Sequence, residues 1–558
     1  MRGILVTSAV TACAATLTLP FLAAPGAASS PERRAAAAQR GIPGATYSLP
    51  LVPLEAGDGT GTADHGRSRA GAVGAGVRGL RPQRVKPFSL VGIVWDNAGT
   101  ELRGRAQVRT RSMGTGTWSG WQDVQVHDHD RPDLGTAEAR AARRGSTAPL
   151  WVGASDAVEV RVRPNAPTGR QQGPTPLPRG MRVELVDPGA EPGHRARGRA
   201  ISPSAPAVPT APAVPSKPAA PSPDDREHAS SAANAPLAPL GAHEIPASSG
   251  RPASAAEVAA ITAVGPGATA SSSDTGEDGP GGGNGEAGER SGADEDASAA
   301  EGGVTDGTVE PTRPATDPSA ADPAEPPRTE HGRPSEDSDD ALDSAADEDN
   351  GSAAYAGYAG PRPRIVTRAG WGADESIRER GFVYAKKVKA AFVHHTASGN
   401  GYTCAQSASV IRGIYRYHVV SSGWRDIGYN FLIDKCGTVY EGRAGGVAKP
   451  VRGAHTLGFN TDSMGIAVLG TFGKTNPATA AVNAVAALSA WKLGLWNANP
   501  RGTTTLVSAG GNLFKKGAKV KLKVISGHRD GYSTECPGDR LYSKLGTARS
   551  AAARLQGR

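Results

Sequence analysis

The chain has 558 residues, a formal net charge of +8 and only 38% hydrophobic residues. This length exceeds what one hydrophobic core normally organises, and the 44 prolines and 73 glycines are unevenly spread, which excludes a single compact domain. A low apolar content is ordinary where a long stretch never folds. We therefore expect more than one folded unit, joined by a linker.

The first residues have the features of an export signal. Arg2 precedes an apolar stretch, and small residues around Gly26 and Ala28 suit cleavage by a signal peptidase. We predict a signal peptide over residues 1–28 and a secreted protein. The alternatives are an uncleaved membrane anchor and a lipid-attachment box at Val10–Cys13. The stretch is short and contains polar residues, Gly and Pro, so no stable membrane span is expected.

Residues 87–188 contain alternating runs such as Val158–Arg163, separated by Gly and Pro. A period of two places the three valines of this run on one face of a strand, and the region is predicted to be a small β-sandwich of unknown role. Trp118 and Trp121 either form a sugar-stacking platform or are core or edge residues. We favour the second interpretation because nothing in the sequence shows that they are exposed.

Residues 189–360 change composition twice. The chain is rich in Pro and Ala from Pro203 to Pro223, then rich in Gly and acidic residues from Asp274 to Asp349, with almost no periodic apolar residues. We interpret the range as a disordered spacer. Its prolines and like charges favour an extended chain that separates the two folded units.

The remaining residues, 361–558, are globular in composition and strongly basic. They hold 29 Lys and Arg against 10 Asp and Glu, a balance of +19. Such a domain suits anionic cell-wall polymers, membrane surfaces or nucleic acid, although a merely solvated basic face is an equally good interpretation. Export argues against nucleic acid.

Apolar runs in this region predict a sheet covered by helices. Residues 389–393 form a short apolar run that ends in His394-His395-Thr396, which places the first histidine at the end of a buried strand. Further along the chain, the patterns predict a helix, a strand pair, a central strand and a second helix at 404–420, 429–441, 464–470 and 478–496.

Three cysteines remain after the signal peptide. In an exported protein they are expected to pair or to bind metal, and Cys404 and Cys436 can form one disulfide, which leaves Cys536. His394, His528 and Cys536 together form a good zinc set, since zinc favours nitrogen and sulfur ligands and three protein ligands leave a fourth position for water. Residues so far apart in sequence also occur together by chance, and each histidine alone is equally well a hydrogen-bonded structural residue.

The residues around this set resemble a known family, the peptidoglycan recognition proteins and related zinc N-acetylmuramoyl-L-alanine amidases. The resemblance covers about Arg364 to Leu545. It is carried by blocks that occur in the family's order: Arg368–Ala373, Phe392–Thr396, Gly423–Asn430, Tyr440–Arg443, Gly453–His455, Gly465–Val468, Gly527–Asp530 and Thr534–Gly538.

The resemblance implies an α/β domain over residues 361–548, with a mixed central sheet flanked by helices and zinc held by His394, His528 and Cys536. Members that bind without cleaving typically lack the cysteine, so Cys536 argues for an enzyme. The implied reaction is hydrolysis of the amide between the lactyl group of N-acetylmuramic acid and L-alanine, by zinc-bound hydroxide. The alternatives are a non-catalytic peptidoglycan-binding module and a wall-associated adhesion or scaffold factor.

By the same resemblance, Tyr429 falls in the position of the catalytic tyrosine, with a core tyrosine as the alternative. Thr534 is given a supporting catalytic role, since a neutral hydroxyl can orient water or substrate. Further residues fall at positions that line the substrate groove, although each can equally be structural: His395, Trp424, His455 and Asn460. Strand alternation points His395 away from His394, which favours a buried, hydrogen-bonded role.

Two departures from the family are visible. Its usual closely spaced cysteines are absent, and the pair Cys404–Cys436 is expected to substitute by joining the start of a helix to a strand turn. Residues 501–523 resemble an inserted basic hairpin that shapes the groove or grips anionic wall polymer. We expect a monomer, located in the secreted fraction or the cell wall, with peptidoglycan as its partner.

Overall fold

Two folded regions are separated in the sequence by the predicted spacer. The computed structural model describes residues 44–54, 76–126, 130–166, 176–190, 226–250, 255–263, 269–270 and 358–558. All of them belong to one unit, formed by Met1–Asp274 and Gly351–Arg558. The predicted signal peptide, 1–28, lies outside the described residues.

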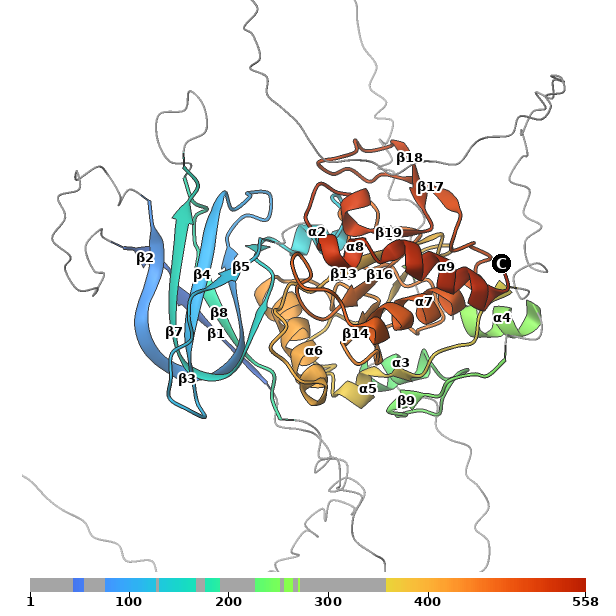
Figure 1. Ribbon diagram of the computed structural model, residues 1–558, viewed down its shortest axis with the longest axis horizontal. Coiled ribbons are helices and arrows are strands. Elements are labelled where there is room, and N and C mark those ends of the chain that lie inside the picture. The colour runs from blue at the N-terminus through green and yellow to red at the C-terminus, as the bar shows by residue number, and fades with distance from the viewer. Residues whose placement is uncertain are drawn as a thin grey trace, which may run out of the picture. The chain divides into compact units, whose positions relative to one another are not determined.

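The N-terminal region is an antiparallel β domain, as expected. Its main sheet runs in the order β1-β8-β3-β7-β4-β5, and β2 and β6 pair with β3. The strands are Ala45–Pro50 (β1), Val52–Pro53 (β2), Arg78–Trp95 (β3), Gly104–Ser112 (β4), Gln122–Val124 (β5), Gly145–Ser146 (β6), Leu150–Pro164 (β7) and Arg182–Asp187 (β8). The long strands β3 and β7 pair with several shifts of register, and β3 is visibly bent (Figure 1).

Alternation along these strands builds the core of the β domain. Val158, Val160 and Val162 are fully buried in one hydrophobic cluster, on the face that the sequence predicts. The strands begin before residue 87, since β1 pairs with β8 along its whole length. Trp118 is 38% exposed at the edge of the domain, and the guanidinium of Arg161 lies 3.8 Å from the ring centre of Trp121.

The C-terminal region contains the mixed sheet that the sequence predicts. Its order is β19-β13-β16-β14-β15-β11-β9. Strand β13 is parallel to both β16 and β19, whereas β14 and β15 are antiparallel. The strands are Glu244–Ile245 (β9), Ile365–Val366 (β11), Ala390–His395 (β13), Phe431–Ile433 (β14), Val439–Glu441 (β15), Ser463–Val468 (β16) and Ile525–Gly527 (β19). The fully buried β13 and β16 therefore form the rigid centre of the domain.

Helices cover both faces of this sheet. Helix α6 (Ser407–Arg416) packs through Val410, Ile411 and Ile414 on one face, and α7 (Thr479–Gly494) and α9 (Leu545–Gln556) pack together on the other (Figure 1). Shorter elements complete the domain: α5 (Arg368–Trp371), α8 (Asp539–Tyr542), η2 (Cys404–Gln406), the π-helical η3 (Tyr417–Ser421) and η4 (His528–Asp530).

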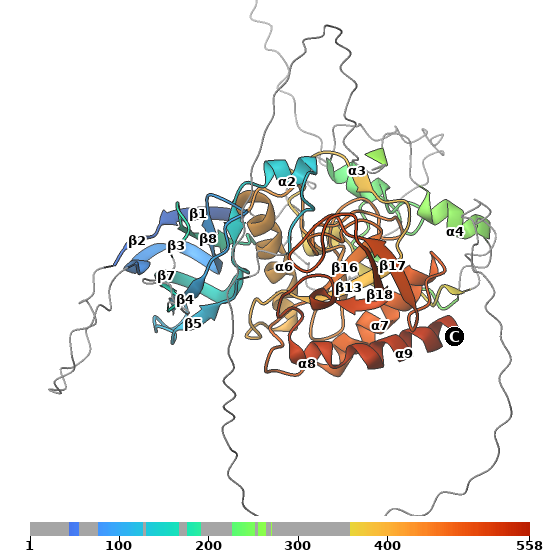
Figure 2. The ribbon, with the colours of Figure 1, turned by 90° about the horizontal axis from the view of Figure 1, so that it is seen from above.

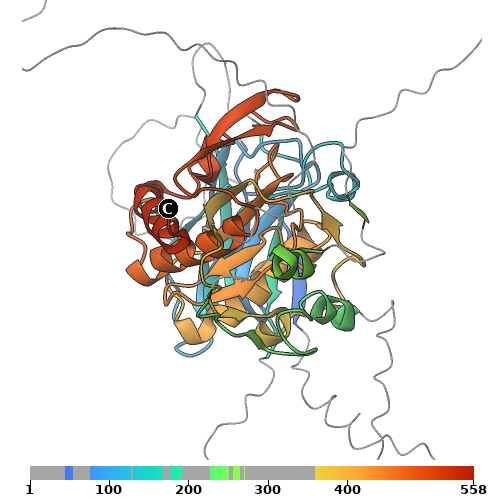
Figure 3. The same ribbon diagram turned by 90° about the vertical axis from the view of Figure 1, so that its right-hand side faces the viewer.

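The residues 501–523 form the expected hairpin. Strands β17 (Thr503–Val507) and β18 (Lys519–Lys523) are antiparallel, and the hairpin lies at the top of the domain in Figures 1 and 3. On β18, Val520 and Leu522 are buried while the alternating lysines are exposed. A second short pair joins β10 (Thr269–Ala270) to β12 (Val383–Tyr384).

Parts of the range interpreted as a spacer pack on the C-terminal domain. Helices α3 (Arg226–Ala232) and α4 (Ala255–Thr262) lie beside it in Figure 2, and β9 pairs with β11. The side-chain amide of Asn234 donates to Glu441 Oε1 at 2.8 Å, and Ile245 is fully buried. Such short elements carry no periodic signal, so composition alone did not reveal them.

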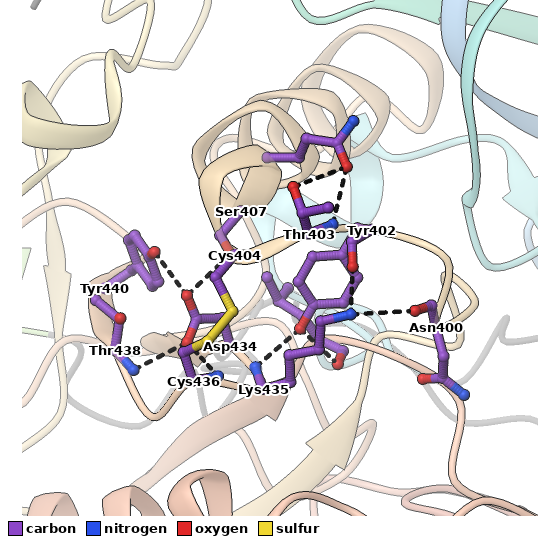
Figure 4. Close-up of a disulfide and its surroundings, with 12 residues drawn as sticks. Asn400, Tyr402, Thr403, Cys404, Ser407, Asp434, Lys435, Cys436, Thr438 and Tyr440 are labelled. Carbon is purple, nitrogen blue, oxygen red and sulfur yellow. Dashed lines mark hydrogen bonds between the residues drawn. A yellow bond between two sulfur atoms is a disulfide. The ribbon is translucent and has the colours of Figure 1, made fainter.

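The disulfide joins Cys404 and Cys436, with their Cα atoms 6.3 Å apart (Figure 4). It connects the start of the helix η2–α6 to the turn between β14 and β15, the connection that the sequence predicts. Beside it, the carboxylate of Asp434 accepts hydrogen bonds from Ser407, Tyr440 and the turn backbone. These contacts fix the helix against the sheet.

Among the described residues, no helix is both long and apolar enough to cross a membrane.

Candidate metal centre

His394 comes from the most buried strand of the sheet. It lies near the end of β13, between β16 and β19, and is completely shielded from solvent. The parallel strand β16 pairs with β13 at His394 itself, and β19 pairs with it as far as Val393. The imidazole is therefore presented from a rigid element, as a metal ligand requires.

His528 and Cys536 come from the segment that follows β19. His528 begins the short helix η4, and its ring centre lies 4.6 Å from that of His394. The backbone N–H of Arg529 donates to the carbonyl of Cys536 at 3.0 Å, which closes the loop between the two residues. Cys536 Sγ then lies 3.7 Å from His394 Nδ1.

A fourth residue of the same cluster comes from the N-terminal β domain. One Asp130 carboxylate oxygen, Oδ1, lies 2.7 Å from His528 Nδ1 and 3.4 Å from His394 Nδ1. The ligand atoms of the four residues all lie within 4.8 Å of one another, and all four residues are buried. Parts of the chain about 400 residues apart in sequence thus meet at one point.

The donor set fits zinc. Two imidazole nitrogens, a thiol sulfur and a carboxylate oxygen are all zinc ligands, and the ligand atoms of a tetrahedral zinc lie roughly 3 to 4 Å apart. Burial raises the pKa of the Cys536 thiol well above its ordinary value, so a bound cation is needed to keep the thiolate that zinc prefers. His394, His528 and Cys536 are therefore the residues that would hold the ion, and Asp130 lies within the same cluster.

A second layer of side chains orients His394. Its Nε2 lies 3.2 Å from His455 Nδ1 and 3.3 Å from Thr456 Oγ1. A metal on Nδ1 requires the proton on Nε2, which then donates to His455. Burial lowers the pKa of His455 well below its ordinary value, so His455 is neutral and can accept this bond. Sequence reasoning placed His455 in the groove, whereas the structure places it behind the metal ligand.

Glycine creates the space for His455. A Cβ atom added to Gly465 on β16 would lie 2.4 Å from the His455 ring, closer than any ordinary contact. Asn460 fixes the backbone of the same loop, because its Oδ1 accepts from the N–H groups of His455 and Thr456 at 2.6 and 3.0 Å. Gly465 and Asn460 thus support the orientation of His394.

Tyr429 lies at the cluster, where the resemblance predicts it. Its ring centre is 5.5 Å from that of His394, and its hydroxyl donates to Asp130 Oδ2 at 2.7 Å. Burial, followed by the neighbouring carboxylate of Asp130, raises the pKa of the phenol well above its ordinary value. Tyr429 therefore remains a hydrogen-bond donor directed at the metal centre.

The three other expected site residues each have a different position. Thr534 Oγ1 accepts from the backbone N–H of Cys536 at 3.3 Å, so it supports the loop that carries this ligand. Trp424 stacks against His418, with ring centres 4.3 Å apart, and lines a cavity of about 390 Å³. His395 is not brought to the cluster, because its Nδ1 accepts from the backbone N–H of Phe472 at 3.3 Å on the other side of β13.

Sequence reasoning missed Asp130 altogether. Asp130 lies in the β domain, and no local pattern connects it to a histidine in the other domain. The one available signal is the run His127-Asp-His-Asp130, which is rich in metal-binding residue types. Also missed were Asp133 and Glu138, whose carboxylates contact the C-terminal domain next to the cluster.

The mixed sheet carries one histidine near the end of β13 and a second directly after β19, and a cysteine comes from the loop that follows. These three residues, buried together with an aspartate, are consistent with the metal site of a zinc amidase domain. Comparison with known proteins supports this class. Residues 384–539 match the family described as N-acetylmuramoyl-L-alanine amidase, and residues 36–180 match the family described as Rv3811 N-terminal galactose-binding domain-like.

Individual relatives define the family further. The chain is 31% identical over 183 residues to peptidoglycan-recognition protein SC2 of Drosophila simulans, a match that covers 33% of this chain and 85% of the relative. It is 32% identical over 187 residues to the N-acetylmuramoyl-L-alanine amidase of Homo sapiens, which covers 33% of this chain and 28% of that protein. The chain therefore belongs to the family of peptidoglycan-recognition proteins and N-acetylmuramoyl-L-alanine amidases.

A solved structure of peptidoglycan recognition protein-LE in complex with tracheal cytotoxin, a monomeric diaminopimelic acid-type peptidoglycan, is 30% identical to this chain. The match covers 33% of this chain and 92% of that one, with a TM-score of 0.25.

Proposed function

We propose that the protein is a zinc-dependent N-acetylmuramoyl-L-alanine amidase that hydrolyses the amide between the lactyl group of N-acetylmuramic acid and L-alanine. The observation that carries this proposal is the complete ligand set. His394, His528 and Cys536 meet at one point inside the region that matches the amidase family. The choice of bond follows from the name of that family and from the human relative.

Zinc bound to this set would polarise the scissile carbonyl and lower the pKa of a water molecule so that the water can attack. The chain itself supplies orientation and a hydrogen-bond donor. His455 and Thr456 hold His394 with Nδ1 toward the cluster, and the 3.2 Å contact with His455 fixes the ring tautomer.

Tyr429 is the residue best placed to stabilise negative charge on the reacting oxygen. Its hydroxyl already donates to a carboxylate oxygen at 2.7 Å, so the geometry suits a negatively charged acceptor. Its raised pKa, caused chiefly by burial, keeps the proton on the phenol through the neutral pH range. Thr534 acts indirectly, by holding the backbone of Cys536.

We also propose that the protein acts outside the cytoplasm, in the cell wall. The Cys404–Cys436 disulfide supports an oxidising compartment, and Arg2 followed by an apolar stretch supports export. The exposed lysines of β18 are available to anionic wall polymers. Peptidoglycan is then both the substrate and the principal partner.

The proposal is tested by mass spectrometry of purified peptidoglycan after incubation with the full chain, with zinc or with a chelator. Cys536→Ala is the matched inactive control. An Asp130→Ala chain is included because Asp130 lies within the ligand cluster. We expect free stem peptides with an L-alanine amino terminus, released only with zinc and with Cys536 in place.

If neither the wild-type chain nor Asp130→Ala releases such peptides, although both sediment with peptidoglycan, the amidase proposal is wrong. That result would favour a peptidoglycan-binding module without catalysis.

A further inference from the structure

We propose that Asp130 is a metal ligand supplied by the N-terminal β domain, and that residues 130–144 occupy the substrate groove, so that the chain is held in a closed, self-inhibited form. The inhibitory part of this inference rests on the proposed amidase function. The ligand part does not. We call residues 130–144 the docking segment.

The position of Asp130 is that of a ligand. Its Oδ1 atom lies near the Nδ1 atoms of both His528 and His394, at 2.7 and 3.4 Å, and belongs to the same cluster as Cys536 Sγ. Catalytic zinc sites keep one of their four positions open to water, whereas closed sites have four protein ligands. With Asp130 in place, the protein provides four.

Charge supports the same conclusion. A zinc ion with two neutral imidazoles and one thiolate keeps a net charge of +1, which is costly where the site is buried. His394 and Cys536 are 0% exposed, and Asp130 is 3% exposed. The Asp130 carboxylate supplies the missing negative charge, and the closed site becomes neutral.

Asp130 also engages the candidate catalytic donor. Its second oxygen, Oδ2, accepts the hydrogen bond of the Tyr429 hydroxyl at 2.7 Å. One carboxylate therefore takes both the fourth ligand position and the hydrogen bond that the reacting oxygen of a substrate would receive. Substrate and Asp130 cannot use the site at the same time.

The rest of the docking segment covers the surrounding surface. Asp133 Oδ1 accepts from the backbone N–H of Gly458 at 2.7 Å and from the side-chain amide of Asn460 at 2.8 Å. The Asn460 amide also donates to the carbonyl of Arg131 at 3.0 Å. Asn460, a residue that the sequence places in the groove, is thus occupied by this segment.

Helix α2 (Ala137–Ala141) continues the coverage. Glu138 forms a two-pronged ion pair with Arg443, with N–O distances of 2.9 and 2.8 Å, and both side chains are buried. Ala142 packs with Trp424 and Ala454 in a small apolar cluster. The segment therefore contacts Trp424, a further residue that the sequence places in the groove. Each of its three acidic side chains contacts the C-terminal domain.

The docking segment can be released without unfolding the β domain. Separate contacts hold the sheet itself to helix α6, since Leu90, Val94 and Val186 share one hydrophobic cluster with Ile411 and Ile414. The segment has only the five-residue helix α2 and is held mainly by polar groups. An acidic ligand, such as a peptide bearing carboxylates, can replace these carboxylate contacts with its own.

The test uses the full chain loaded with cobalt(II) in place of zinc, and azide as a small probe of the metal. We compare wild type, Asp130→Ala, Glu138→Gln and the control Asp156→Ala. Asp156 is an aspartate of the same β domain that pairs with Arg111. The visible spectrum reports the ligands of cobalt, and release of stem peptides from peptidoglycan reports activity.

We expect azide to change the spectrum of Asp130→Ala but not that of wild type or Asp156→Ala. Hydrolysis by Asp130→Ala should exceed that of wild type by at least about tenfold, because the competent fraction limits the apparent rate. Glu138→Gln keeps all four ligands and should show a smaller increase. It remains informative if Asp130→Ala fails to fold.

Identical spectra and equal azide responses in wild type and Asp130→Ala would show that Asp130 is not a ligand. Loss of hydrolysis in Asp130→Ala, with wild type active, would show that Asp130 serves catalysis and would overturn self-inhibition. If the spectra change as expected but no variant cleaves peptidoglycan, the ligand assignment stands and the amidase function fails.

Discussion

Strand β13 and the docking segment both bring a residue to the metal cluster, but they are built differently. His394 lies on a buried strand with parallel partners on both sides. Asp130 begins a segment with one short helix, held by hydrogen bonds and by the Glu138–Arg443 ion pair. The comparison teaches that the strands fix the chemistry of the site, whereas polar contacts of the segment control access to it.

The largest effect is expected from the ligands that the C-terminal domain supplies. His528→Ala removes one ligand, and in a chain opened by Asp130→Ala we expect hydrolysis to fall by at least about 1000-fold, since the metal supplies the main activation. Stem-peptide release and metal content by mass spectrometry measure the loss. If the variant still holds one equivalent of zinc and cleaves at the rate of its parent, His528 is not a required metal ligand.

Loss of the disulfide tests whether zinc binding depends on the stability of the fold. Cys404→Ser with Cys436→Ser should lower the free energy of unfolding by about 3 kcal/mol, because the crosslink restricts the unfolded chain. Urea denaturation measures this change. Zinc content should stay at the wild-type value, and a parallel loss of zinc would place the metal centre and the disulfide in one coupled unit.

His455 tests the second layer behind His394. His455→Ala removes the acceptor at 3.2 Å from His394 Nε2 and should weaken zinc binding or activity by about 10- to 100-fold. Competition with a chromogenic chelator gives the affinity. His455→Asn keeps an acceptor and should recover part of the lost zinc affinity or activity. Equal losses in both variants would show that the hydrogen bond to His394 does not account for the loss.

Replacement of His418 should give the smallest effect, a change in how the free energy of unfolding depends on pH. Burial lowers its pKa to about 3, while in the unfolded chain the value is near 6.5. Between these values the unfolded state binds a proton that the folded state does not, so stability is lost as the pH falls from 6.5 toward 3.

His418→Asn keeps an acceptor for the backbone N–H of Gly428. Its free energy of unfolding should fall less than that of wild type as the pH is lowered. Urea denaturation at pH 7.5 and 5 compares the two proteins. Equal declines would mean that other groups account for the pH dependence.

Sequence patterns predicted the parts of the site that local structure determines. His394 follows a continuous apolar run, and Cys536 lies eight residues after His528, so family motifs identify them. Strand alternation also favoured a separate, hydrogen-bonded role for His395, which contacts Phe472. The mixed sheet followed from the same motifs.

Long-range packing determined what the sequence could not predict. Asp130 reaches the cluster because the β domain docks on the C-terminal domain, and no periodicity reports such docking. Asn234 and β9 were assigned to a spacer for the same reason. Both are held to the C-terminal domain by a few hydrogen bonds, from Asn234 to Glu441 and between β9 and β11. The amino-acid composition does not reveal such contacts.

The most direct test of the account compares the initial rate of stem-peptide release by wild type, Asp130→Ala and the double variant Asp130→Ala/Cys536→Ala, each loaded with zinc. The account predicts slow release by wild type, faster release by Asp130→Ala, and none by the double variant. Equal release by wild type and Asp130→Ala would contradict the closed site, and release by the double variant would contradict a metal centre that depends on Cys536.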